Sequence, residues 1–192
     1  VEYYKKFPNI SAWQIENEPF LSYGICDPVT DETYQLVAKE VEIVKMSDPR
    51  PILITDSGEL GIWTNAIKLA DIFGTTLYRQ TWSKILGTQT FPLPPFFYTI
   101  KDKLVRSIVG KNSRTIISEL QAEPWLADRQ DPAVDTITEQ ARLMSVSDLE
   151  NNINFAMETN FTQIYLWGVE WWYFMAQNGY PQYLEYARTL FK

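Results

Sequence analysis

Five short apolar runs, separated by segments long enough for helices, constrain the fold of this chain more than any other feature. Each run has the length of a strand and is rich in β-branched or aromatic residues, as strands are. The runs cover Ile10–Ile15, Pro51–Thr55, Ile72–Tyr78, Thr115–Leu120 and Gln163–Val169. Strands that alternate with helices form βαβ units and pair in parallel. We therefore expect an α/β protein built on a parallel sheet.

Helix signals occupy the intervals between these runs. Thr30 has the side chain of an N-cap, and Asp31 and Glu32 follow it in a first turn where the helix dipole favours acidic groups. An apolar stripe with helical spacing continues through Tyr34, Val37, Val41 and Val44. The segment Asp48-Pro49-Arg50-Pro51 ends this helix, because proline cannot continue it.

Three further helices are expected towards the C-terminus. Ser147 and Glu150 fit a capping box at the start of one. Pro181 fits the first turn of the last one, where proline is tolerated. The third covers Ile100–Val109 and follows an irregular apolar loop at Phe91–Phe97.

Two architectures fit this alternation, a doubly wound sheet and a (β/α)8 TIM barrel. A doubly wound nucleotide-binding domain has a glycine-rich turn after its first strand, and none of the eight glycines forms one. A barrel places polar residues at the ends of several strands, and this chain does so. A barrel has eight units and ~250 residues. We therefore expect residues 1–192 to be a single domain, a partial barrel of about five βα units that lacks the N-terminal units.

Composition excludes several kinds of chemistry. The chain has no histidine, which removes the Ser-His-Asp triad, the Cys-His pair and most zinc sites. Its single cysteine, Cys26, excludes an internal disulfide. A net charge of −7 argues against a nucleic-acid partner, and no apolar run reaches the ~18–20 residues of a membrane span. We expect no metal and no cofactor, so the chemistry must depend on side chains such as carboxylates.

Two glutamates close strand-like runs in matching contexts. Glu18 follows Ala12-Trp13-Gln14-Ile15-Glu16-Asn17 and precedes Pro19, and Glu119 follows Thr115-Ile116-Ile117-Ser118. The carboxyl ends of parallel strands meet at one edge of a sheet, so both side chains are expected at one site. Glycoside hydrolysis needs such a pair, one acting as acid/base and one as nucleophile.

Three motifs resemble those of clan A glycoside hydrolases, including cellulases and β-glycosidases. Trp13-Gln14-Ile15-Glu16-Asn17-Glu18-Pro19 is similar to the Asn-Glu-Pro signature that ends the fourth strand of that clan. Ile116–Gln121 resembles the seventh strand, which carries the nucleophile, and Ile164–Gly168 resembles the eighth, whose tryptophan forms the floor of the sugar site. The resemblance implies the fourth to eighth units of the barrel. It also implies a retaining hydrolase that cleaves a β-linked oligo- or polysaccharide.

The resemblance also implies roles for individual residues. Glu18 is the expected acid/base and Glu119 the expected nucleophile. Asn17 is expected to bind the sugar 2-hydroxyl, and Tyr78 to orient Glu119 through its phenol. The remaining expected substrate-binding residues are Trp167, Glu170 and Trp171, with Trp82 and Trp125 in loops on the same face.

Each of these residues also has a structural interpretation. Glu18 fits a solvated turn, and Glu119 fits an ion pair with Arg79 or Arg114. Tyr78 and some of the tryptophans fit core positions. For the whole chain, the alternatives are a non-catalytic carbohydrate-binding barrel, an inactive piece of a hydrolase, and a carboxylate-rich protein that binds calcium or magnesium.

Overall fold

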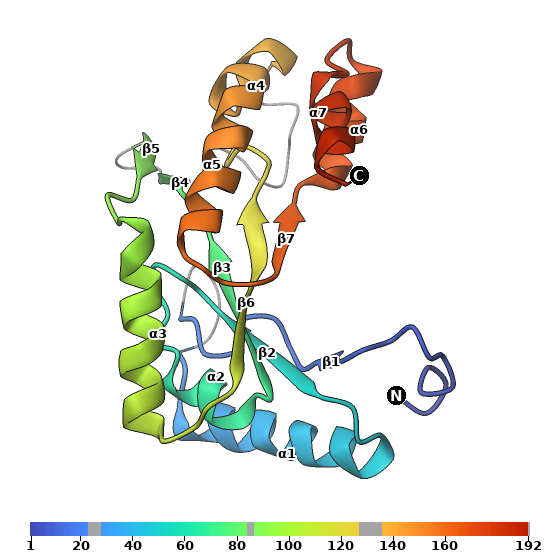
Figure 1. Ribbon diagram of the computed structural model, residues 1–192, viewed down its shortest axis with the longest axis vertical. Helices are drawn as coiled ribbons and strands as arrows, with labels where there is room; N and C mark the ends of the chain where they lie inside the picture. Colours follow the sequence, from blue (N-terminus) through green and yellow to red (C-terminus); the bar gives the residue numbers. More distant parts are fainter. Residues whose placement is uncertain (23–27, 84–86, 127–135, 192) are drawn as a thin grey trace.

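The computed structural model describes residues 1–22, 28–83, 87–126 and 136–191, so Cys26 lies outside the described residues. A five-stranded sheet has the order β1-β2-β3-β6-β7, and every neighbouring pair is parallel. Its strands are β1 (Trp13–Gln14), β2 (Ile52–Asp56), β3 (Ile72–Leu77), β6 (Arg114–Gln121) and β7 (Ile164–Trp167). Figure 1 shows this sheet twisted and curled between the helices. The expectation of parallel strands paired in chain order is confirmed.

Helices connect the strands, as βαβ units require. They are α1 (Asp31–Ser47), α2 (Thr64–Leu69), α3 (Pro95–Val109), α4 (Ile137–Leu143), α5 (Val146–Glu158), α6 (Val169–Gln177) and α7 (Gln182–Leu190). A separate antiparallel hairpin, β4 (Gln80–Ser83) and β5 (Gly87–Thr90), lies between β3 and α3. None of the described helices is both long and apolar enough to cross a membrane. This sheet and its helices are compatible with part of a (β/α) barrel.

The start of α1 follows the sequence prediction, and the start of α3 does not. Thr30 caps α1 and shares a capping box with Thr33. α3 begins at Pro95, five residues before the predicted Ile100, so the end of the predicted loop is already helical. Pro95 occupies the first turn, where its missing N–H costs no hydrogen bond.

The capping box predicted at Ser147 and Glu150 is wrong. Ser145 is the N-cap of α5: its Oγ accepts the N–H of Asp148 at 3.1 Å, and Asp148 Oδ2 accepts the N–H of Ser145 at 2.9 Å. Ser147 lies inside the helix and is exposed. Aspartate can complete the box as glutamate does, so the motif started two residues earlier than predicted.

The strand predicted at Gln163–Val169 ends early, because α6 already begins at Val169. Gly168 between them has a φ of 138°, and a Cβ at this position would lie 2.8 Å from the carbonyl carbon of Ala122. Only glycine fits such a turn without strain. Trp171 and Trp172 therefore lie on a helix and not at a strand end.

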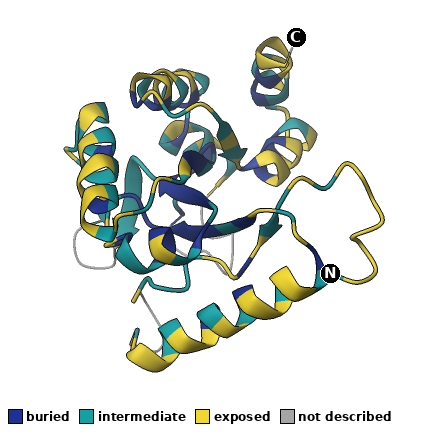
Figure 2. Ribbon diagram, turned by 60° about the horizontal axis from the view of Figure 1, so that its bottom comes forward, coloured by how far each residue is buried: buried dark blue, intermediate teal, exposed yellow. Residues whose placement is uncertain are grey.

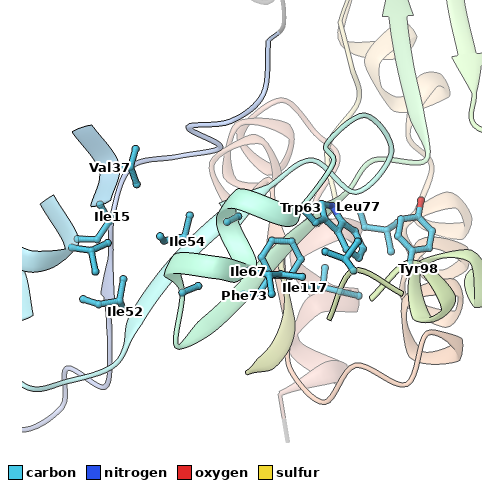
Figure 3. Packing of buried hydrophobic residues seen from close by; sticks show 14 of the residues in the cluster. Ile15, Val37, Ile52, Ile54, Trp63, Ile67, Phe73, Leu77, Tyr98 and Ile117 are labelled. Atoms are coloured by element: carbon cyan, nitrogen blue, oxygen red, sulfur yellow. The ribbon is translucent and has the colours of Figure 1, made fainter. Parts of the chain in front are cut away.

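Two hydrophobic clusters hold the fold together. The larger one joins the sheet to α1, α2 and α3, and Figure 3 shows Ile54, Trp63, Phe73 and Ile117 within it. The second joins α5, α6 and α7 around Leu149, Trp172 and Tyr183, among others. Figure 2 shows that α1 is exposed along much of its length while the central strands are buried. The larger cluster thus fixes the strands whose ends carry the polar residues described below.

The corrected cap of α5 can be tested by two matched substitutions. Ser145→Ala removes a side-chain acceptor for a helix N–H, so the free energy of unfolding should fall by about 1 kcal/mol. Ser147→Ala changes an exposed helix position and should stay within about 0.5 kcal/mol of the parent protein. Urea unfolding followed by circular dichroism measures both. A larger loss for Ser147→Ala than for Ser145→Ala would contradict the assignment.

Candidate functional site

A cavity of about 500 Å³ opens at the carboxyl ends of the parallel strands. Five side chains that were predicted as site residues line it, and they come from the ends of β1, β3, β6 and β7. The lining includes Asn17, Glu18, Tyr78, Glu119 and Trp167, and also Glu59, Thr76, Trp82 and Trp125. Its volume lies within the range of small-ligand sites. The structure therefore brings together side chains that are up to 150 residues apart in the chain.

The segment after β1 is held in an unusual backbone conformation. Glu18 has a φ of 48°, a left-handed value that glutamate rarely adopts. Its N–H donates to Thr55 Oγ1 at 2.9 Å, and the Thr55 hydroxyl in turn donates to Asn17 Oδ1 at 3.4 Å. Thr55 is fully buried on β2. One buried hydroxyl thus fixes both residues, and strain of this kind is common at functional sites.

The carboxyl group of Glu18 is partly buried and reaches β3, the second strand along the sheet from β1. Its Oε1 accepts a hydrogen bond from Thr76 Oγ1 at 2.9 Å. Burial raises the pKa of Glu18 to about 7; the negative charge of Glu119 adds to this effect, and the Thr76 hydrogen bond opposes it. A carboxyl group with such a pKa can give and take a proton near neutral pH.

Glu119 lies on β6 and is held by Tyr78. The Tyr78 phenol donates a hydrogen bond to Glu119 Oε2 at 2.8 Å, which is the contact that the sequence predicts. The β3–β6 register shifts just before this point, because Thr75 pairs with Ile117 and Thr76 pairs with Glu119. A bulge of this type re-aims the side chain that follows it.

Thr76 brings the two glutamates to one place. Its hydroxyl donates a hydrogen bond to Glu18, and its backbone pairs with Glu119 on the adjacent strand β6. Both carboxyl groups also line the same cavity. The alternative partner of Glu119, Arg79, has its guanidinium 3.8 Å from the centre of the Phe155 ring and donates to the Leu93 carbonyl.

Aromatic side chains form the walls of the cavity. Trp125 meets Tyr78 edge to face, with their ring centres 5.4 Å apart. Trp82 comes from the hairpin β4–β5, which is tied to β6 by Gln121. The Gln121 side chain accepts from Gln80 N at 2.9 Å and donates to Gln80 O at 2.8 Å. Trp167 ends β7 and is about half exposed.

Two of the predicted substrate-binding residues lie elsewhere. Trp171 is buried in the second cluster, packs against Tyr183 with the two rings tilted, and donates its indole N–H to Gln140 at 2.9 Å. Glu170 is exposed near the start of α6. Both positions follow from the early start of α6, which turns the chain away from the cavity after Trp167.

Sequence reasoning missed Thr55, Thr76 and Glu59. The signal for the threonines was a hydroxyl inside an otherwise apolar strand, in Ile52–Asp56 and Ile72–Leu77. Glu59 lies in the segment that follows β2, where the sequence shows only an acidic residue beside glycine. Within the described residues, no group of three or more acidic or cysteine side chains is placed to hold a metal ion.

No protein-family model matches the chain, and no curated protein matches its sequence. A solved structure of Faecalibacterium prausnitzii beta-glucuronidase is similar over 86% of this chain and 26% of that chain, with 14% identity and a TM-score of 0.46. This chain therefore spans about a quarter of that protein. At this identity and TM-score, the similarity carries no argument about function.

The raised pKa of Glu18 predicts a pH-dependent effect of Glu18→Gln. Below about pH 4.5 the carboxyl group is protonated in the folded and unfolded states, so its burial has little cost. Between pH 4.5 and about 7 the folded state binds more protons, so the free energy of unfolding falls as the pH rises. Glutamine cannot ionise, so Glu18→Gln should gain stability relative to the parent protein across this interval.

The gain should reach on the order of 1–2 kcal/mol and level off above pH 7. Thermal unfolding measured from pH 4.5 to 8 tests this. Glu150→Gln, which makes the same change at an exposed position on α5, is the matched control. If the stability difference between Glu18→Gln and the parent protein stays constant with pH, the pKa of Glu18 is not raised in the folded state.

Proposed function

We propose that this chain is the catalytic part of a retaining glycoside hydrolase that cleaves a β-linked oligo- or polysaccharide. The observation that carries this proposal is a pair of carboxyl groups in one cavity with different surroundings. Glu18 has a pKa raised by burial, whereas Glu119 accepts a hydrogen bond from a phenol. Glycosidases use such a difference to give one carboxyl group the proton and the other the nucleophilic role.

The proposal includes the architecture of the domain. We assign residues 1–192 to one catalytic domain, whose five strands are the fourth to eighth of a (β/α)8 barrel. Two features support this: the strands are parallel and neighbour each other in chain order, and the site residues lie at their carboxyl ends. In the described sheet, β1 and β7 each have one strand neighbour, and the other barrel strands would pair with their free edges.

In the first step, a Glu119 oxygen attacks the anomeric carbon and forms an ester bond. The bond from that carbon to the leaving oxygen breaks, and Glu18 gives its proton to this oxygen. In the second step, Glu18 takes a proton from water while the water oxygen attacks the anomeric carbon and the ester bond to Glu119 breaks. Two displacements retain the configuration, and they need carboxyl groups ~5–5.5 Å apart.

The other cavity residues bind the substrate in this proposal. Asn17 binds the sugar 2-hydroxyl, and the rings of Trp82, Trp125 and Trp167 offer flat faces to the C–H groups of sugar rings. The proposal gives no such contact to Trp171 or Glu170, because neither lines the cavity. The aromatic walls would equally suit a protein that binds saccharides without cleaving them, so the test must separate binding from turnover.

A division of labour between the two glutamates tests the proposal. Glu119→Gln should abolish turnover of both an aryl glycoside and a natural glycoside, because no covalent intermediate forms. Glu18→Gln should spare the first step on the aryl glycoside, whose leaving group needs little protonation, and should slow the second step. Each rate loss should be at least ~10²-fold. The measurement is steady-state and burst kinetics on the full-length protein.

Azide distinguishes the two roles. Added azide should rescue Glu18→Gln and give a glycosyl azide of retained configuration, because azide attacks the intermediate without a base. With Glu119→Gln, any azide product should be inverted. Exchanged stereochemistry would reverse the roles. Saccharide binding with no turnover by the parent protein would favour a binding protein instead, and full activity of either variant would show that the pair is not catalytic.

A further inference from the structure

A third carboxyl group, Glu59, lines the cavity and belongs to neither proposed catalytic role. It lies in the segment between β2 and α2. Burial is the main cause that raises its pKa, which is about 7. Burying a carboxyl group is costly unless hydrogen bonds satisfy it. Glu59 accepts two such bonds, and they show which elements it joins.

Glu59 joins helix α3 to the end of strand β3. Its Oε1 accepts hydrogen bonds from the Tyr98 hydroxyl at 2.6 Å and from the Tyr78 N–H at 3.1 Å. Tyr98 is fully buried on α3. Because β3 ends at Leu77, which pairs with Leu120, the Tyr78 N–H lies past the last paired residue of this strand. Glu59 supplies an acceptor where the β3–β6 ladder has ended.

The segment that carries Glu59 is itself fixed at several points. Lys101 donates to the carbonyls of Gly58 at 2.8 Å and Gly61 at 2.7 Å. Asp56 accepts the Trp63 N–H at 3.0 Å, which closes the segment on itself. At Gly58 a Cβ would lie 2.2 Å from the Thr76 carbonyl oxygen, so the segment lies directly against β3. These contacts fix the backbone on both sides of Glu59, so its carboxyl group is held beside the Tyr78 N–H.

We propose that Glu59 is a positioning residue, which holds the backbone of Tyr78 so that the Tyr78 phenol can hold Glu119. The inference rests on the proposed function, because it gives Glu59 a role through the proposed nucleophile. The contacts form one path from Tyr98 through Glu59 and Tyr78 to Glu119. Loss of the Glu59 acceptor releases the Tyr78 backbone, and a displaced phenol no longer fixes the Glu119 carboxylate.

Covalent labelling measures this effect on the nucleophile alone. A panel of 2,4-dinitrophenyl 2-deoxy-2-fluoro-β-glycosides, with gluco, galacto and manno sugars, is applied to the full-length protein. Glu119 forms an ester bond to the anomeric carbon while dinitrophenolate leaves with the bonding electrons and needs no proton. Intact-protein mass spectrometry gives the labelling rate constant. The reaction therefore does not depend on Glu18 as an acid.

Glu59→Leu should slow labelling by ~10–100-fold, the effect of a small displacement of a reacting group. Glu59→Gln keeps an oxygen that accepts both hydrogen bonds, so labelling should stay within about threefold of the parent protein. In a Tyr78→Phe background, Glu59→Leu should change labelling by less than about twofold, because the phenol that it positions is absent. A residue with only a structural role would slow labelling equally with and without the Tyr78 phenol.

Tyr183→Phe is the matched control for lost stability. It removes a buried tyrosine hydroxyl that donates to the Met144 carbonyl at 2.7 Å in the second cluster, whereas Tyr98 belongs to the larger cluster. It should lower the melting temperature and leave labelling unchanged. If Glu59→Leu fails to fold, Glu59→Asp, which keeps the charge and shortens the reach by one methylene, takes its place.

The outcomes separate the two proposals. Equal effects of Glu59→Leu with and without the Tyr78 phenol would overturn the positioning role while leaving the hydrolase proposal intact. The same holds if Glu59→Gln labels as slowly as Glu59→Leu. Failure of the parent protein to form an adduct at Glu119 with any member of the panel would overturn the proposed function, and the role of Glu59 with it.

Discussion

The pairing of β3 with β6 is the interaction on which the rest of the site depends. These two central strands lie in parallel, and a register shift before Thr76 sets Thr76 opposite Glu119. The Thr76 hydroxyl then reaches Glu18, which arrives from the edge strand β1. Thr76 on β3 thus contacts the Glu18 carboxyl group and is the backbone partner of Glu119. Each of the buried side chains around it, such as Phe73 and Ile117, keeps that pairing in place.

The two glutamates differ because their strands end in different ways. β1 is short, and the chain after it adopts left-handed backbone values, so Glu18 is partly buried and reaches Thr76 on β3. Glu119 instead remains within a long strand and meets a hydroxyl donor from its neighbour. Burial is the largest cause that raises the pKa of Glu18, and the negative charge of Glu119 adds to it.

Much of this arrangement could be predicted from the sequence, and the failures have physical causes. The five apolar runs predicted the parallel strands, and Glu18, Glu119 and Tyr78 were placed at the correct edge because strand ends carry polar side chains. Trp171 was misplaced because a tryptophan two residues into a helix looks the same in sequence as one that continues a strand end. Glu59 and Thr76 were missed because their roles come from partners 19 and 58 residues away, and no local pattern records such contacts.

The hairpin β4–β5 forms one wall of the cavity, yet its strands are no part of the main sheet. The Gln121 side chain ties the hairpin to the main sheet, because it both accepts a hydrogen bond from the Gln80 N–H and donates one to the Gln80 carbonyl. These two bonds resemble the backbone pairing of a neighbouring strand. A backbone contact of this kind does not depend on which side chains the hairpin carries. A change of side chain at Trp82 therefore leaves this backbone contact, and the strands that carry Glu18 and Glu119, unchanged. The fold thus separates the hairpin wall of the cavity from the strands that carry the two glutamates.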